Sequence, residues 1–116
     1  MKNTDLTAIS PLDGRYASKC DPLRPIFSEY GLIHFRTLVE VRWLQFLAAH
    51  PGIEGLDPLS PVVNRFLDEL VDGFDRKSAE QVKGIEKTTN HDVKAVEYFL
   101  ADRFGDDREL AALKPF

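Results

Sequence analysis

Three adjacent polar residues, Asn90, His91 and Asp92, stand where an amphipathic helix is expected to begin. Apolar residues follow them at helical spacing, namely Val93, Val96, Phe99, Leu100 and Phe104. The first turn of a helix has backbone N–H groups without helical partners and the positive end of the helix dipole, so it suits a phosphate or a carboxylate. An imidazole there could bind such an anion or exchange a proton with it. The pattern is typical of a binding site, and equally of an ordinary helix cap.

The helix-cap interpretation requires no ligand. Thr89 would cap the helix, Asp92 would reciprocate three residues later, and His91 would be exposed. Short polar residues are the usual helix starters, so this segment alone favours the cap. Two threonines, an asparagine and a histidine in succession are more than a cap needs, which keeps the binding interpretation open.

A second candidate segment is Arg15-Tyr16, just after a turn predicted at residues 11–14. The Arg15 guanidinium could hold a phosphate or carboxylate through two parallel hydrogen bonds, and Tyr16 could add a hydroxyl or a stacking face. An arginine after a turn is more often a plain surface residue. By itself this segment is a weak indication of a site.

Composition argues against several classes of function. The 116 residues carry a formal net charge of −4, which argues against a nucleic-acid partner. Cys20 is the only cysteine, and no pair of His or Cys has metal-site spacing, so neither an internal disulfide nor a metal is expected. Residues 1–5 lack a signal-peptide core and no apolar run reaches membrane length, which predicts a cytoplasmic protein without a membrane partner.

Helical periodicity dominates the chain after an irregular lead-in over residues 1–25, and no alternating run predicts a strand. The expected fold class is therefore all-α. Start and stop signals place helices at 28–50, from Ser60-Pro61, from a capping box at Ser78 to near Thr88, at 91–104 and at 108–113.

The long first helix has apolar residues on several sides. Polar positions such as Arg36, Thr37, Glu40 and Gln45 would leave only part of its surface in solvent. A helix of this kind is usual at the centre of a larger assembly. The last residues, 114–116, have no polar tail, so we expect an interrupted element and a chain that is incomplete by itself.

Taken together, four segments resemble the amino-terminal part of bacterial adenylosuccinate lyases, within the fumarase/aspartase superfamily of β-elimination lyases. They are residues 6–16, 27–32, 39–44 and 85–98. The resemblance implies that 1–116 is the amino-terminal helical domain of a longer homotetrameric lyase. It implies release of fumarate from adenylosuccinate, giving AMP, and from the succinylated aminoimidazole carboxamide ribotide of purine synthesis, without metal or organic cofactor.

The resemblance also implies roles for the candidate residues. Arg15 and Tyr16 would contact the phosphate end of this anionic nucleotide substrate, and Asn90, His91 and Asp92 would form a second substrate-binding segment. The general-acid histidine and the serine base of a mobile loop have no counterpart in 1–116, so no catalytic residue is expected here. The chain alone is expected to be inactive. Whether His91 transfers a proton or only binds stays open.

Two alternatives remain. One is another superfamily lyase, of the argininosuccinate lyase or fumarase type, which the segments around Arg15 and His91 argue against. The other is a non-catalytic helical interaction module, which the over-apolar first helix would also suit.

Overall fold

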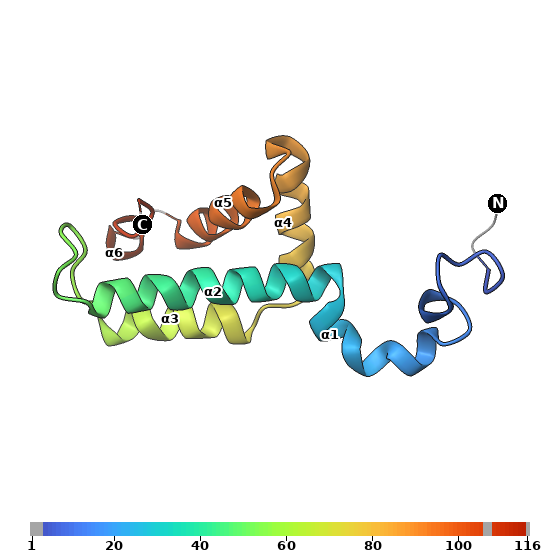
Figure 1. Cartoon of the computed structure of the whole chain (residues 1–116). Helices are drawn as coiled ribbons and strands as arrows, with labels where there is room; N and C mark the ends of the chain where they lie inside the picture. Colours follow the sequence, from blue (N-terminus) through green and yellow to red (C-terminus); the bar gives the residue numbers. More distant parts are fainter. Residues whose placement is uncertain (1–3, 106–107, 116) are drawn as a thin grey trace. The chain divides into compact units, whose positions relative to one another are not determined.

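The computed structural model describes residues 4–105 and 108–115, which divide between two compact units, Met1–Leu32 and Ile33–Phe116. The expectations about Met1, Lys2, Asn3 and Phe116 concern positions outside the described residues. The described part of the chain is helical and has no strand, so the all-α prediction is confirmed (Figure 1). None of its helices combines the length and apolar character needed to cross a membrane.

The first unit is more regular than the predicted irregular lead-in. It contains the 3-10 helices η1 (Pro11–Asp13) and η2 (Ala17–Leu23) and the short helix α1 (Arg24–Phe27). Prolines within and between these segments limit continuous α-helix, since proline has no backbone N–H to donate. Arg24 joins the two ends of η2, because its guanidinium donates to Ala17 O (2.6 Å) and pairs with Asp21 (2.7 Å).

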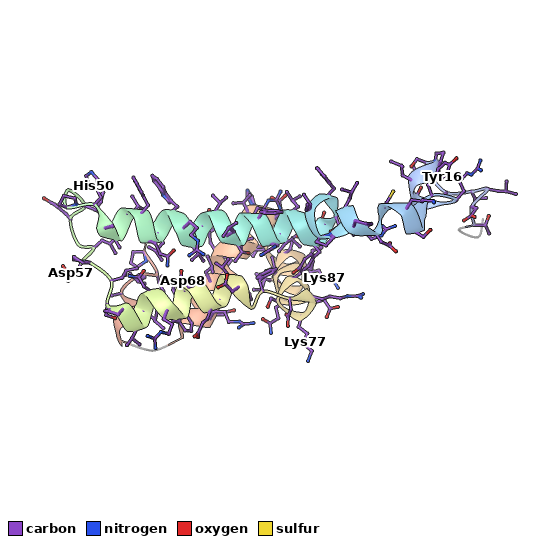
Figure 2. The ribbon with its side chains drawn as sticks, turned by 90° about the horizontal axis from the view of Figure 1, so that it is seen from below. Tyr16, His50, Asp57, Asp68, Lys77 and Lys87 are labelled. Atoms are coloured by element: carbon purple, nitrogen blue, oxygen red, sulfur yellow. The ribbon has the colours of Figure 1, made fainter. Side chains whose placement is uncertain are left out.

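The second unit is built on most of α2 (Glu29–Ala49), whose bounds lie within one residue of the prediction. A loop leads to α3 (Pro61–Asp72), which returns antiparallel beside α2 (Figures 1 and 2). Then α4 (Arg76–Thr89) and α5 (Asp92–Phe104) pack on each other as a helical hairpin, and α6 (Arg108–Ala111) ends two residues earlier than expected. The core lies where α2, α3 and α5 bury their facing sides, with Val41, Leu67 and Val96 fully enclosed.

The predicted capping box at Ser78 is wrong. Helix α4 begins at Arg76 with Asp75 as its N-cap, three residues before the predicted cap. The Asp75 carboxylate accepts hydrogen bonds from the Ser78 backbone N–H (2.9 Å) and from the Ser78 hydroxyl (3.1 Å). A carboxylate is at least as good an N-cap as a hydroxyl. Asp75 therefore takes the cap position, and Ser78 lies buried inside the first turn of the helix.

The polar positions of α2 do not face solvent as the sequence pattern indicated. Thr37 is fully buried, and its hydroxyl donates to Ile33 O (2.9 Å). Gln45 is half-buried and donates to Asn64 (3.3 Å) and Asp68 (3.1 Å) on α3. These polar side chains can be buried on the inner face of α2 because each has a hydrogen-bond partner there.

The outward side of α2 carries large apolar residues instead. Val39 is 63% exposed, Trp43 55% and Phe46 61%, and Phe35 continues the row toward the start of the helix. The Trp43 and Phe46 rings stack on each other at 5.6 Å. We call Phe35, Val39, Trp43 and Phe46 the apolar stripe. These residues are three or four positions apart, so they lie on one face of the helix and form a continuous exposed apolar surface.

Two valines on α2 test which side is the core. Val41→Ala should lower the free energy of unfolding of the 116-residue chain by about 2 kcal/mol, because it removes two buried methyl groups and leaves a cavity. Val39→Ala is the matched control and should change it by less than about 0.5 kcal/mol. The change in helix propensity is the same in both variants. Equal effects in urea unfolding would mean that the two faces are assigned wrongly.

Candidate functional site

Arg15 and Tyr16 project from a turn that is closed by the Asp13 carboxylate. This carboxylate accepts the backbone N–H of Ser10 (2.8 Å) and of Ile9 (3.3 Å). The hydrogen bond from Ser10 lowers the pKa of Asp13 more than any other contact. The turn is tight, since a Cβ added to Gly14 would lie 3.0 Å from Ala8 Cβ. The turn predicted at residues 11–14 is thus confirmed, and it leads directly to Arg15.

The Arg15 side chain is exposed and lies over its neighbour. Its Cζ is 4.8 Å from the centroid of the Tyr16 ring, a cation–π distance. Within the described residues Arg15 forms no ion pair with a carboxylate. Its guanidinium donors are therefore available to an anionic ligand, while the tyrosine ring orients the group.

The second segment is the junction between α4 and α5. Thr89 is the last residue of α4, and Asn90 ends it in the left-handed conformation (φ 55°), donating its N–H to Glu86 O (2.7 Å). Asparagine accepts this conformation more readily than most residues. The N-cap of α5 is His91, two residues after the predicted Thr89, because the left-handed Asn90 separates the two helices. The predicted Thr89 cap is wrong for that reason.

The His91 ring serves as the cap through one nitrogen. Its Nδ1 accepts the backbone N–H of Lys94 at 3.3 Å, while 65% of the side chain stays exposed. Accepting this bond requires a lone pair on Nδ1, so the neutral ring carries its proton on Nε2. The ring can thus cap the helix and offer an Nε2–H donor to a ligand at the same time.

The backbone amides at this helix start are less available than the sequence suggested. The Asp92 carboxylate accepts the N–H of Val93 (2.8 Å), and His91 takes the N–H of Lys94. An anion at the helix start would also meet the negative charge of Asp92. The side-chain groups at this junction that can still donate to an anionic ligand include the His91 Nε2–H and the exposed amide of Asn90.

Asp92 also connects the junction to α2. Its Oδ2 lies 3.1 Å from a guanidinium nitrogen of Arg36, which is three-quarters buried. The hydrogen bond from Val93 N–H and the charge of Arg36 both lower the pKa of Asp92, the first more strongly. The sequence placed Arg36 among solvent-facing residues, and nothing local marks it, since its partner is far along the chain.

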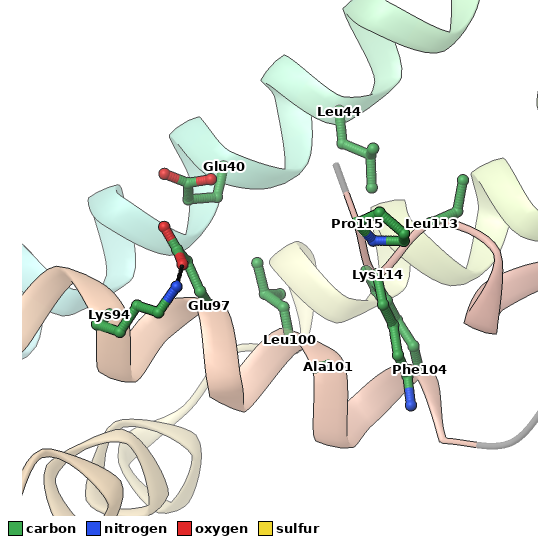
Figure 3. A pocket seen from close by; sticks show the side chains of 10 residues that line it. All are labelled: Glu40, Leu44, Lys94, Glu97, Leu100, Ala101, Phe104, Leu113, Lys114 and Pro115. Carbon is green, nitrogen blue, oxygen red and sulfur yellow. Dashed lines mark hydrogen bonds and ion pairs between the residues drawn. The ribbon is translucent and has the colours of Figure 1, made fainter. Parts of the chain in front are cut away.

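The predicted residues thus form two clusters. Asn90, His91 and Asp92 come together at one helix junction, and Arg15 and Tyr16 adjoin each other in the other unit. A pocket beside α5 contains none of these residues (Figure 3). Glu40, Glu97 and Lys94 line one end of it, and Lys94 is already paired with Glu97 (2.8 Å). Lys114 also lines the pocket, so its two lysines balance its two glutamates and leave no net positive charge to attract an anionic ligand.

No group of three or more histidine, cysteine or acidic side chains in the described residues is arranged to hold a metal ion. The two other histidines, His34 and His50, form contacts within the fold. His34 stacks on Phe74 (5.3 Å), and His50 accepts the N–H of Gly52 (3.0 Å) just after α2. Cys20 is half-buried.

The Asp92 contacts predict a pH-dependent stability. A carboxyl whose pKa is lowered by folding stabilises the fold above its ordinary pKa of 3.8, and this contribution is lost as pH falls through the folded pKa. The difference in urea midpoint between the wild type and Asp92→Asn should therefore be largest near neutrality and shrink between about pH 5 and pH 2. Solvent screening keeps the difference modest.

Asp57→Asn, in the loop between α2 and α3, is the control for general charge effects. Asp57 is exposed and forms no ion pair with any described residue, so its substitution should shift the midpoint little at any pH. A pH-independent difference for Asp92→Asn would contradict the role assigned to its ionised carboxylate.

Comparison with known proteins gives a consistent result over the full chain. It is 53% identical to adenylosuccinate lyase of Haemophilus influenzae, 51% to that of Escherichia coli strain K12 and 44% to that of Legionella pneumophila strain Corby. Each alignment covers 100% of this chain and 25% of the relative, so the chain spans about a quarter of the length of these curated proteins. No family model matches the chain.

Identity at this level over every residue is far beyond what an all-helical fold alone would produce. The residues that are predicted to bind substrate and the helices that carry them lie inside the aligned region. Over all of its 116 residues, the chain is therefore similar to the adenylosuccinate lyases of these three bacteria.

Proposed function

We propose that these residues are the amino-terminal helical domain of a carbon–nitrogen lyase of purine biosynthesis. The full-length protein would eliminate fumarate from adenylosuccinate, giving AMP, and from the succinylated aminoimidazole carboxamide ribotide. The observation that carries this proposal is the 41–53% identity to named adenylosuccinate lyases along the entire chain. The protein is proposed to work in the cytoplasm.

The chemistry of the two clusters supports a substrate with several negative charges. Arg15 would hold the phosphate through its planar guanidinium, with Tyr16 stacked against it. His91 would donate its Nε2–H to an anionic or carbonyl oxygen near the reacting carbons. Asn90 would add amide hydrogen bonds, and Asp92 would accept from hydroxyl or amino groups, because a carboxylate cannot stabilise an anion.

His91 is assigned to binding rather than to the elimination step. Proton removal beside a carboxylate needs a base, and loss of the amine needs an acid. The neutral His91 ring already uses Nδ1 as a helix cap, and only one nitrogen faces a ligand. We assign the acid and the base to parts of the full-length protein beyond residue 116.

The apolar stripe supports a larger assembly. Phe35, Val39, Trp43 and Phe46 would be covered when this domain packs within a homotetramer, where burial of large apolar side chains drives association. The same face would also suit a non-catalytic interaction module. Activity of the full-length protein separates these two functions.

Fumarate release is the direct test of the lyase proposal. The full-length protein containing these residues should convert adenylosuccinate to AMP and fumarate, measured by chromatography of both products. The 116-residue chain at equal molar concentration should release none, because it lacks the proposed acid and base. Inactive full-length protein would favour the interaction module, and an active 116-residue chain would contradict the assignment of catalysis beyond residue 116.

A cap-preserving substitution tests the binding role of His91. Asparagine is a strong N-cap, so His91→Asn should keep the helix start and remove the Nε2–H donor. In the full-length protein kcat/KM should fall roughly tenfold to a hundredfold while thermal stability is retained. Ser60→Asn, a cap exchange on α3, is the matched control and should leave kcat/KM unchanged.

The same comparison applies to the first cluster. Arg15→Ala should raise KM by removing a charged hydrogen-bond donor, whereas Lys19→Ala, at an exposed cation four residues on, should not. Near-normal kinetics for both His91→Asn and Arg15→Ala would mean that neither cluster binds substrate: His91 would be only a helix cap and Arg15 only a surface residue.

A further inference from the structure

We propose that Arg36 is a positioning residue: through Asp92 it fixes the start of α5, and therefore His91, against α2. The inference rests on the proposed lyase function and assigns a role to a residue that is not itself among the proposed substrate-binding residues. Its basis is the chain of contacts from α2 to the junction between α4 and α5.

Each oxygen of the Asp92 carboxylate has its own partner. Oδ1 accepts the N–H of Val93 at 2.8 Å, in the first turn of α5, and Oδ2 lies 3.1 Å from the Arg36 guanidinium. The carboxylate is thus a bridge with one end in the first turn of α5 and the other on α2. Two engaged oxygens restrict its rotation more than a single ion pair does.

Arg36 is the better-shielded partner. Its side chain is 25% exposed, compared with 45% for Arg42 in the corresponding pair with Asp68 of α3. An ion pair that is partly withdrawn from water is screened less by solvent and salt. Its loss would also leave Asp92 as an unpaired negative charge beside an anionic substrate.

The remaining bonds of this junction are local. Thr89 exchanges hydrogen bonds with the N–H and C=O of His91 (3.3 and 3.2 Å), and Asn90 bonds to Glu86 on α4. Among the described residues, the Arg36 ion pair is the only hydrogen bond or ion pair from residues 89–92 to α2. Apolar packing of α5 begins at Ala95, beyond the His91 cap, so the first turn depends on this polar link.

The test uses the full-length protein with Arg36→Met, Arg36→Lys and, as matched control, Arg42→Met. Arg42 lies on the same helix and also pairs with an aspartate, but its partner is on α3. Arg36→Met should lower kcat/KM at least about tenfold, because small displacements of binding groups have large kinetic effects. Arg36→Lys should recover part of the loss, and Arg42→Met should be near normal.

A second measurement does not depend on activity. Hydrogen exchange followed by mass spectrometry should show faster exchange in peptides covering residues 91–95 of Arg36→Met, but not of Arg42→Met. In kinetics, Arg36→Met should have little further effect when Asp92→Asn is already present, because the two residues act as a unit.

The outcomes are distinct. Unchanged exchange at 91–95 in Arg36→Met overturns the positioning role, and so does an additive effect with Asp92→Asn. Faster exchange with unchanged kcat/KM would mean that the helix start matters to the fold and not to the site, which also overturns the proposal. If the wild type releases no fumarate, the lyase proposal fails instead, and exchange alone decides whether Arg36 holds the helix start.

Discussion

The inner face of α2 buries polar and apolar side chains together, and this constraint shapes the second unit. Val41 and Leu44 are enclosed by the surrounding helices, while Thr37 and Gln45 lie among them. A polar group removed from water must form a hydrogen bond, or folding loses the energy of its hydration. No buried side-chain nitrogen or oxygen in the described part of the chain lacks a partner. Helices α3 and α5 are thus positioned by polar contacts as well as by apolar burial.

The same constraint explains the two sides of α2. Polar residues on its inner side form hydrogen bonds to neighbouring helices, as Gln45 does with Asn64 and Asp68 on α3. The opposite side carries the apolar stripe, where the Trp43 and Phe46 rings stack on each other and stay more than half exposed. Such a face lowers its free energy when another surface covers it. The helix therefore supplies one face to the internal core and leaves a second apolar face exposed.

At the helix junction of residues 89–92, side chains that cap or connect the helices are the ones proposed to bind substrate. Asn90 supplies the left-handed residue that separates two helices, and His91 caps the second one through Nδ1. Asp92 bonds to the first turn and to Arg36. Capping by His91 therefore does not exclude a binding role for the same ring. A ring that caps with one nitrogen still presents the other, and the cap fixes which nitrogen carries the proton.

Helix content, helix bounds and the family could be predicted from the sequence, because periodicity, proline and glycine act locally and the motifs are specific. Local signals misplaced two caps: at Ser78, because the Asp75 carboxylate caps α4 earlier, and at Thr89, because the left-handed Asn90 ends α4 and His91 caps α5. The sequence alone determined that α2 has more apolar surface than one core needs. Only the tertiary structure decided which face is buried and that Arg36 reaches Asp92, because a contact between distant segments depends on packing that no local pattern records.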